Sequence, residues 1–193
     1  MSTAGTIYAS NRRDELIAAA ASCFDRDGFG AASIRNIAAE AGMQTASIYY
    51  HFESKDALLL AVHEQGLRHI TAATSQAIEG VEPGWDKVLA ACTAHLQTLL
   101  GGDPIYKAIM RPLPVTLEVR QQIVDMRERY ENIFRDLVAD LELPDATDRR
   151  YLRLMLLGAM NWSFMWFQGG ESDIDSLASS IVANLRNSLE LGT

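Results

Sequence analysis

The stretch "IRNIAAEAGMQTASIYYHFESKDALL", residues 34–59, decides the fold of this chain. Its first part, residues 34–41, carries apolar side chains at helical spacing and stops at Gly42. After a tight turn, residues 45–51 form a second short segment, and Ser54 is placed to cap a third, longer one. The pattern predicts two short helices joined by a glycine-containing turn and followed by a long helix.

The second short helix has an unusual set of aromatic residues. Ile48 and Phe52 lie four residues apart, so they share one face and are expected to be its buried anchors. Tyr49, Tyr50 and His51 are consecutive and cannot all point toward the core. Hydroxyl and imidazole groups are therefore expected on the outside of this helix.

Apolar residues at helical spacing recur along nearly the whole chain, and the alternation typical of strands is hard to find. We expect a first helix from about Asn11 to Gly28, and Ser33 as the cap of the second. Further helices are expected at about 55–78, 86–100, 104–110, 115–141, 145–168 and 174–189. The predicted fold class is all-α, with a three-helix N-terminal head (residues 1–55) and a helical C-terminal body (residues 56–193).

Composition and charge restrict the classes of function. With 193 residues, 48% apolar and 22% charged, the chain can form a globular core. Its net charge of −8 argues against a protein that coats nucleic acid or anionic lipid through bulk electrostatics. Residues 1–60 hold five Lys/Arg and seven Asp/Glu, so most of the acidity lies in the rest of the chain.

Three features favour a cytoplasmic protein without membrane contact. The N-terminal "MSTAGTIYASNRR" lacks the apolar run of a signal peptide. The most apolar stretch, Leu152–Phe167, is interrupted by polar residues and is too short to cross a bilayer. Cys23 and Cys92 each lie in an apolar helical stretch, and we expect them to be buried thiols in a reducing compartment.

The sequence offers no motif for catalysis or metal binding. It contains no Gly-x-Ser-x-Gly and no recognisable pairing of histidine with cysteine. The histidines at 51, 63, 69 and 95 form no i, i+3 or i, i+4 pair, so a metal site on a helix has no ready ligands. We expect no enzyme activity, no metal and no cofactor.

Two short helices on a longer first helix form a helix-turn-helix arrangement, whose second helix can enter the major groove of DNA. Outward hydroxyl and amide groups can then meet base edges and phosphates. A structural interpretation stays open, in which Tyr49 packs on the following helix and His51 is a polar cap. The alternative function is then a helical protein-interaction module without sequence-specific DNA binding.

From about residue 13 to 60 the chain resembles the TetR family (AcrR-like) of transcriptional regulators. The resemblance rests on an Ile-Ala pair, Ala-Gly, a short Tyr-containing helix, His-Phe, and Ser-Lys before an acidic residue. It implies a regulator, more often a repressor, whose head binds a palindromic operator on double-stranded DNA. It also implies that the body binds a small-molecule effector and forms a homodimer through the last two long helices.

Ten residues are candidates for DNA contact, most of them by their position in the family pattern. Ser33, Lys55 and either Tyr50 or His51 would lie at phosphates, and Arg35 would hold the flanking backbone. Gln44, Thr45, Ser47 and Tyr49 would read the bases or lie near them. Ala46 stands where many members have glycine and could touch a thymine methyl group. The candidates are Ser33, Arg35, Gln44, Thr45, Ala46, Ser47, Tyr49, Tyr50, His51 and Lys55.

The body is rich in aromatic and methionine side chains, which suit a pocket for an elongated apolar effector. The tail "NWSFMWFQGG" resembles a subgroup of TetR-like regulators, some of which respond to acyl-coenzyme A thioesters or sterol-derived intermediates. His95 and Arg111 are candidates for a polar contact, although His95 could also be an ordinary core histidine. The candidate effector-binding residues are Trp85, His95, Tyr106, Met110, Met126, Tyr130, Trp162 and Trp166.

Residues 151–170 are apolar on nearly every side of a helix, so we expect this helix to be buried all round, by its own domain or by a partner. A monomeric core is the alternative to a dimer seam. The long helix beginning at Lys55 belongs to both head and body, and Gly66 in its middle is a candidate point of flexing.

Overall fold

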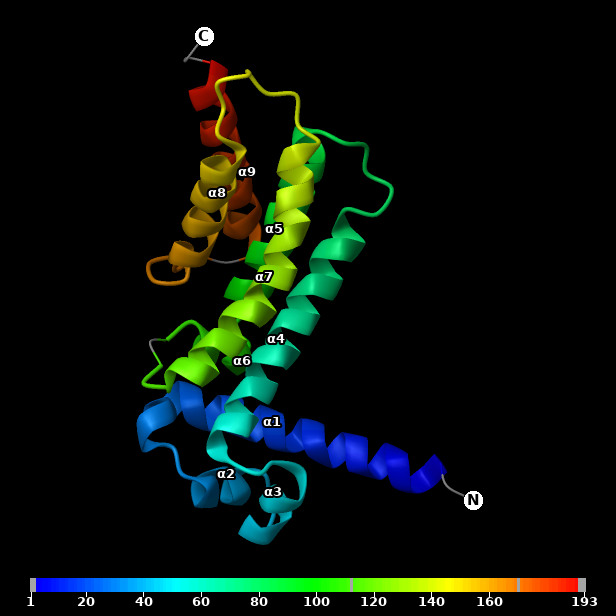
Figure 1. Ribbon diagram of the computed structural model, residues 1–193, viewed down its shortest axis with the longest axis vertical. Helices are drawn as coiled ribbons and strands as arrows, with labels where there is room; N and C mark the ends of the chain where they lie inside the picture. The colour runs from blue at the N-terminus through cyan, green and yellow to red at the C-terminus, as the bar shows by residue number, and fades with distance from the viewer. Residues whose placement is uncertain (1–2, 112, 170, 191–193) are drawn as a thin grey trace. The chain divides into compact units, whose positions relative to one another are not determined.

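The structure is a computed structural model that describes residues 3–111, 113–169 and 171–190 (Figure 1). Within these ranges every regular element is an α-helix, so the predicted all-α class is confirmed. The helices are α1 (Thr3–Ala31), α2 (Ile34–Glu40), α3 (Thr45–His51), α4 (Lys55–Ala77), α5 (Trp85–Leu100), α6 (Pro104–Ile109), α7 (Leu117–Ala139), α8 (Arg149–Ser163) and α9 (Glu171–Glu190).

The start of α1 differs from the prediction. The helix begins at Thr3 rather than near Asn11, because residues 3–10 contain no proline and only one glycine to interrupt it. At Gly28 the backbone leaves the helical region with φ of 76°, which a residue with a Cβ rarely adopts. The predicted break at Gly28 is therefore present as a kink, and a further turn continues to Ala31.

The boundaries of α2 and α3 agree closely with those read from the sequence. The Ser33 hydroxyl accepts a hydrogen bond from the backbone N–H of Asn36 (3.1 Å), and Ser54 does the same for Ala57 (3.0 Å). Both serines are thus helix N-caps, as predicted. Gly42, with φ of 64°, makes the turn between the two short helices.

The contacts divide the chain into two compact units. The first comprises Met1–Gly66 and Pro104–Met126, and the second comprises Leu67–Asp103 and Arg127–Thr193. α4 and α7 each contribute residues to both units. The boundary expected after residue 55 concerns the DNA-binding segment alone and stays a prediction.

A continuous hydrophobic core fills the first unit. In the core, α1, α2 and α3 meet α4, α6 and the start of α7. Each fully buried aliphatic or phenyl side chain contributes roughly 1.5–3 kcal/mol to folding. Side chains with at most 1% exposure include Leu16, Ile17, Phe24, Ile37, Ile48, Leu58, Leu59 and Val62.

Gly66 is a point of close packing between α4 and α6. A Cβ placed on Gly66 would lie 2.8 Å from Cγ2 of Ile105 and 3.2 Å from Cδ1 of Ile109. The Tyr106 hydroxyl donates a hydrogen bond to the Gly66 carbonyl (3.2 Å). The glycine is therefore required by the neighbouring helix, a role that the sequence pattern did not indicate.

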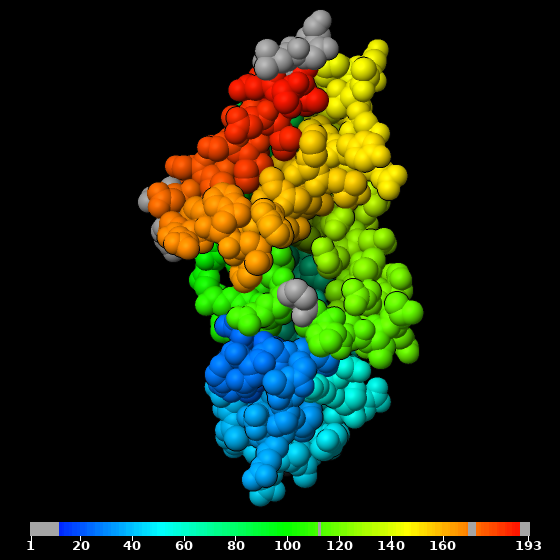
Figure 2. Space-filling view, turned by 90° about the vertical axis from the view of Figure 1, so that its left-hand side faces the viewer, coloured from blue at the N-terminus to red at the C-terminus, as the bar shows by residue number. Residues whose placement is uncertain are grey.

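In the second unit α5 packs on α8 and α9, and α8 packs on α9 (Figure 2, yellow-orange to red). α9 buries one stripe, with Ile174, Ala178 and Val182 at its centre, as its spacing predicted. α8 is shorter than the expected 145–168. Asp148 caps it by accepting from the backbone N–H groups of Arg150 and Tyr151.

α8 is not buried on every side within its own unit. Its inner face, including Leu152, Leu156 and Met160, is buried, whereas its outer face is left open. Trp162 is 67% exposed. The helix is therefore not enclosed within its own unit, and the choice between a monomeric core and a dimer seam stays open. The exposed large apolar side chains on and just beyond α8 are Tyr151, Leu154, Met155, Trp162, Met165 and Trp166.

Candidate functional site

The outward face of α3 is built on two anchors. Ile48 and Phe52 are buried in the core of the first unit, which fixes the rotation of the helix. Tyr50 is 84% exposed. Within α3, Ile48 is the only buried residue. His51 is half-buried, and the remaining residues are exposed as well: Thr45, Ala46, Ser47 and Tyr49. Gln44, just before the helix, is exposed as well.

A surface hollow of about 360 Å³ lies along this face. Gln44, Ser47, Tyr50 and His51 line it, together with the turn at Gly42 and Met43 and with Arg12 of α1. The rings of Tyr50 and His51 meet edge to face, with centroids 5.1 Å apart. Four of the sequence-predicted DNA residues thus share one concave surface with Arg12.

The two predicted residues of α2 lie at its start. Ser33 is exposed although its oxygen accepts the capping bond, so its hydroxyl hydrogen remains able to donate outward. Arg35 is exposed two residues later. Both positions are compatible with contact to a phosphate backbone.

Lys55 has an internal role that the sequence did not reveal. Its ammonium donates to the carbonyls of Phe29 (2.8 Å) and Ala32 (2.9 Å), with Gly30 at 3.4 Å. The same ammonium lies 4.5 Å from the centroid of the Phe29 ring. These acceptors match the three N–H donors of an ammonium, so Lys55 holds the kinked end of α1. Its contact with DNA stays a prediction.

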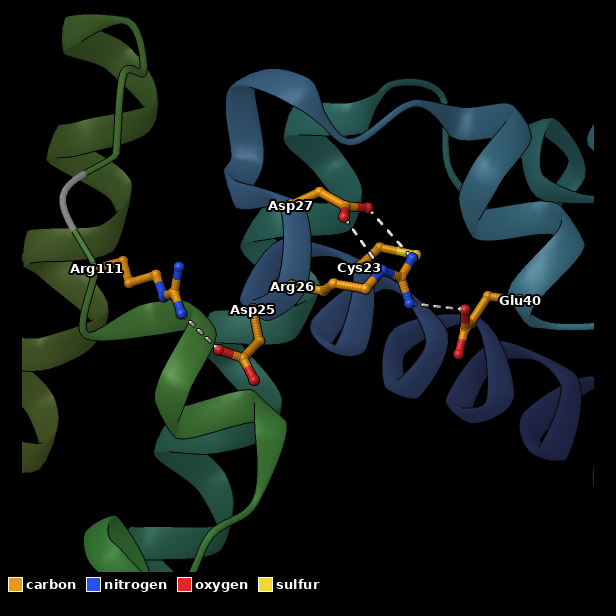
Figure 3. A network of polar contacts seen from close by, with 6 residues as sticks. All are labelled: Cys23, Asp25, Arg26, Asp27, Glu40 and Arg111. Atoms are coloured by element: carbon orange, nitrogen blue, oxygen red, sulfur yellow. Dashed lines mark hydrogen bonds and ion pairs between the residues drawn. The ribbon is translucent and has the colours of Figure 1, made fainter. Parts of the chain in front are cut away.

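Arg26 is likewise engaged within the first unit. It pairs with Asp27 and Glu40, both at 3.1 Å, and its Nη2 lies 3.4 Å from Sγ of Cys23 (Figure 3). Hydrogen bonds to Asp27 and then Glu40 raise the pKa of Arg26. Burial raises the pKa of the Cys23 thiol despite the neighbouring guanidinium.

Arg111, a candidate for an effector contact, instead forms an ion pair with Asp25 of α1 (3.0 Å, Figure 3). Cys23 and Cys92 are free and buried, as predicted. Burial raises the pKa of Cys92 to about 12, so this thiol stays protonated.

Two of the predicted effector residues meet in the core of the second unit. Nδ1 of His95 lies 2.7 Å from the Tyr130 hydroxyl, which is 3.2 Å from Oγ1 of Thr74. Burial lowers the pKa of His95 to about 4, and the Asn161 side chain acts in the opposite direction. Nε2 of His95 is buried and has no hydrogen-bond partner of good geometry among the residues that the structure describes. α4, α5 and α7 therefore each supply one member of a polar cluster, and the sequence pattern missed Thr74.

The other predicted effector residues are dispersed. Tyr106, Met110 and Met126 belong to the first unit, where Tyr106 is buried and bonded to Gly66. Trp162 and Trp166 are exposed. Trp85 lines an open cavity of about 650 Å³ in the second unit, together with residues 140–144 and Arg186. The assignment of these residues to an effector stays a prediction.

The described part of the chain holds no cluster of three or more His, Cys, Asp or Glu side chains that could bind a metal ion. None of its helices is long and apolar enough to cross a membrane.

Comparison with known proteins matches two family descriptions to successive parts of the chain. A family described as "Bacterial regulatory proteins, tetR family" matches residues 16–62, which contain α2, α3 and the start of α4. A second, "Tetracyclin repressor-like, C-terminal domain", matches residues 81–189. The HTH-type transcriptional repressor Rv1474c of Mycobacterium tuberculosis is 31% identical over 157 residues, covering 77% of this chain and 80% of that protein.

Solved structures share the fold. The transcriptional regulator FadR from Bacillus subtilis, in complex with stearoyl-CoA, has a TM-score of 0.77 at 19% identity and covers 89% of this chain and 96% of that one. AibR, in complex with isovaleryl coenzyme A and operator DNA, has a TM-score of 0.76 at 19% identity, with the same coverages of 89% and 96%. The chain therefore belongs to the TetR family of bacterial transcriptional regulators, which confirms the resemblance of its residues 13–60.

Proposed function

We propose that the chain is a transcriptional repressor that binds a palindromic operator as a homodimer and leaves it when a largely apolar effector binds. The observation that carries the proposal is the surface of α3. Its single buried residue, Ile48, fixes the helix, and its hydroxyl-bearing and aromatic side chains face outward. A relative that matches most of the chain is described as a repressor.

The exposed groups suit recognition of duplex DNA. Gln44 and Ser47 present an amide and a hydroxyl near the start of α3, the end of a recognition helix that contacts base edges. A glutamine amide can bond adenine through two hydrogen bonds. Because the net charge is −8, affinity must come from local contacts to phosphates and should weaken steeply with salt.

The exposed apolar face of α8 supports a homodimer. Large apolar patches on a soluble protein mark interaction surfaces, and a two-fold contact between copies matches a two-fold operator. The proposed seam consists of α8 and α9 from each copy. Tight binding then requires the two reading helices to lie roughly 34–36 Å apart, one turn of DNA.

For the effector we propose an acyl-coenzyme A thioester, with sterol-derived intermediates as the second class. Two proteins of the same fold are described with acyl-CoA ligands. The effector must bind more tightly to the state that leaves DNA, since equal affinity for both states shifts nothing. We propose that it acts by tilting α4, and that the regulator works in the cytoplasm without enzymatic activity or cofactor.

The test is a selection of random duplex DNA on the purified full chain at moderate salt. A recovered palindrome would support a dimeric regulator, and its release by acyl-CoAs of graded chain length would identify the effector class. If no sequence is enriched by a folded dimer that mass analysis shows to be free of small molecules, the proposal is wrong.

A further inference from the structure

Among the described residues that line the hollow beside α3, one carries a permanent positive charge, and it comes from a different helix. Arg12 of α1 lines it together with the side chains of Gln44, Ser47, Tyr50 and His51. Among the other lining residues, Gly42 and Met43 carry no charge. The hollow therefore combines a guanidinium with a hydroxyl from Ser47, a phenol from Tyr50 and an imidazole from His51, all of which can donate to an anionic oxygen.

The contact that Arg12 makes within the protein is weak. Nη1 of Arg12 lies 3.2 Å from the Glu15 carboxylate, one helical turn away, and the two side chains are 57% and 41% exposed. Exposed pairs of this kind contribute between zero and about 1 kcal/mol. The guanidinium can thus exchange Glu15 for a phosphate at little cost.

Other cations of the head are held more firmly. Arg26 bonds two carboxylates, and Lys55 donates to carbonyls at the end of α1. Arg13 lies 5.1 Å from the centroid of the Phe52 ring. Of the five Lys and Arg in residues 1–60, Arg12 is the one that lines the hollow.

We propose that this hollow seats one phosphate of the DNA backbone and that Arg12 is the cation that binds it. This inference rests on the proposed DNA binding and adds a contact from α1. Arg12 fixes the position of α3 on the duplex without reading a base, because a phosphate carries no sequence information.

The test compares Arg12→Ala with Arg120→Ala, which removes the same charge from an exposed position on α7. Both full-length variants are titrated against the duplex recovered by selection and against a scrambled duplex, at several salt concentrations. We expect Arg12→Ala to weaken binding to both duplexes by about tenfold or more, the effect of losing a charge-assisted hydrogen bond. The slope of log K against log salt should fall by about 0.9, the value for one phosphate contact. Glu15→Gln should leave binding equal or tighter.

Several results would overturn the inference. If Arg12→Ala and Arg120→Ala weaken binding equally, the effect is one of overall charge and not of the hollow. If Arg12→Ala changes only the sequence preference, the residue reads a base. If inorganic phosphate binds the free protein in an Arg12-dependent way while DNA affinity is unchanged, the hollow serves a free anion. Failure of the wild-type chain to bind any duplex would instead reject the proposed function itself.

Discussion

α3 and α8 are alike in burial and opposite in chemistry. Each buries one face and leaves aromatic side chains open, Tyr50 on α3 and Trp162 on α8. The groups that line the hollow with Tyr50 are a hydroxyl, an amide, an imidazole and a guanidinium. Around Trp162 the exposed groups are aliphatic and thioether side chains, including Leu154 and Met155.

This difference shows that an exposed aromatic side chain indicates the kind of partner only when the chemistry of the neighbouring side chains is considered with it. A phenol among donors can meet phosphate and water alike, so exposure costs α3 little when DNA is absent. An indole beside leucine and methionine gains most from a second apolar surface. We therefore expect substitutions on α8 to change association of the protein with itself, and those on α3 to change association with DNA.

The largest effect is expected on α8. Replacing Met155 and Trp162 together by glutamate places two charges on the proposed seam. Buried anchors at interfaces often contribute 2 kcal/mol or more each, so dimerisation should weaken by about 1000-fold. Analytical ultracentrifugation over a range of concentrations measures it, with unchanged helical circular dichroism as the control for folding. A dimer of wild-type stability would show that α8 is not the seam.

The second prediction concerns the pH dependence of stability. It rests on His95, a buried residue of α5, which packs on α8. Burial holds the pKa of His95 at about 4, below about 6.5 in an unfolded chain. Between these values the unfolded state binds a proton that the folded state does not. The free energy of unfolding is therefore not reduced by His95 above about pH 6.5. It falls as the pH decreases toward 4, by roughly 1.4 kcal/mol per pH unit and by up to about 3 kcal/mol in all.

Urea unfolding at pH 7, 6, 5 and 4 measures this slope. His95→Gln should flatten it, whereas substitution of the exposed His69 by Gln should leave it as in wild type. An equal slope in wild type and His95→Gln would assign the pH dependence to other groups. Subtracting the variant's curve removes the contribution of the carboxylates, which also titrate in this range.

The third prediction compares the substitution of two exposed tyrosines, one on α3 and one on α8. Tyr50→Ala on α3 should weaken DNA binding about tenfold, or about 1.4 kcal/mol, and leave dimerisation unchanged. Tyr151→Ala on α8 should weaken dimerisation, and it should leave DNA binding unchanged when the protein concentration is far above the dimer dissociation constant. Tyr50→Phe separates the hydroxyl from the ring. Fluorescence anisotropy with the selected duplex and sedimentation supply the two readouts, and the comparison fails if both variants affect the same one.

The smallest effect is expected at Ser33. Ser33→Ala removes the cap of α2 and should cost about 1 kcal/mol of stability, whereas Ser33→Gly should cost only a few tenths. Both variants lose the hydroxyl that could donate to a phosphate. Equal loss of DNA affinity in the two variants would therefore assign Ser33 to DNA, and loss that follows the stability would limit it to capping.

Much of the fold was predictable because its determinants are local. Helical spacing, Gly28 and Gly42, and the caps at Ser33 and Ser54 placed α2, α3 and the start of α4 correctly. The outward face of α3 followed from the spacing of its two anchors. These features depend on residues close together in the sequence, which a pattern can show.

Features that join distant residues were not predictable. The carbonyls that bind Lys55 lie more than twenty residues earlier, at a helix end whose geometry depends on the kink. The cluster of Thr74, His95 and Tyr130 draws on three helices, and no spacing within one helix indicates it.

Gly66 has a mechanical consequence. With no side chain at this position, Ile105 of α6 rests directly against the backbone of α4, and Tyr106 ties the two helices by a hydrogen bond to that backbone. Close-packed contacts have little compressibility, so there is no slack to absorb a displacement of α6. A movement of α6 is therefore transmitted directly to α4. The substitution Gly66→Ala would push α6 away from α4, in addition to making α4 stiffer.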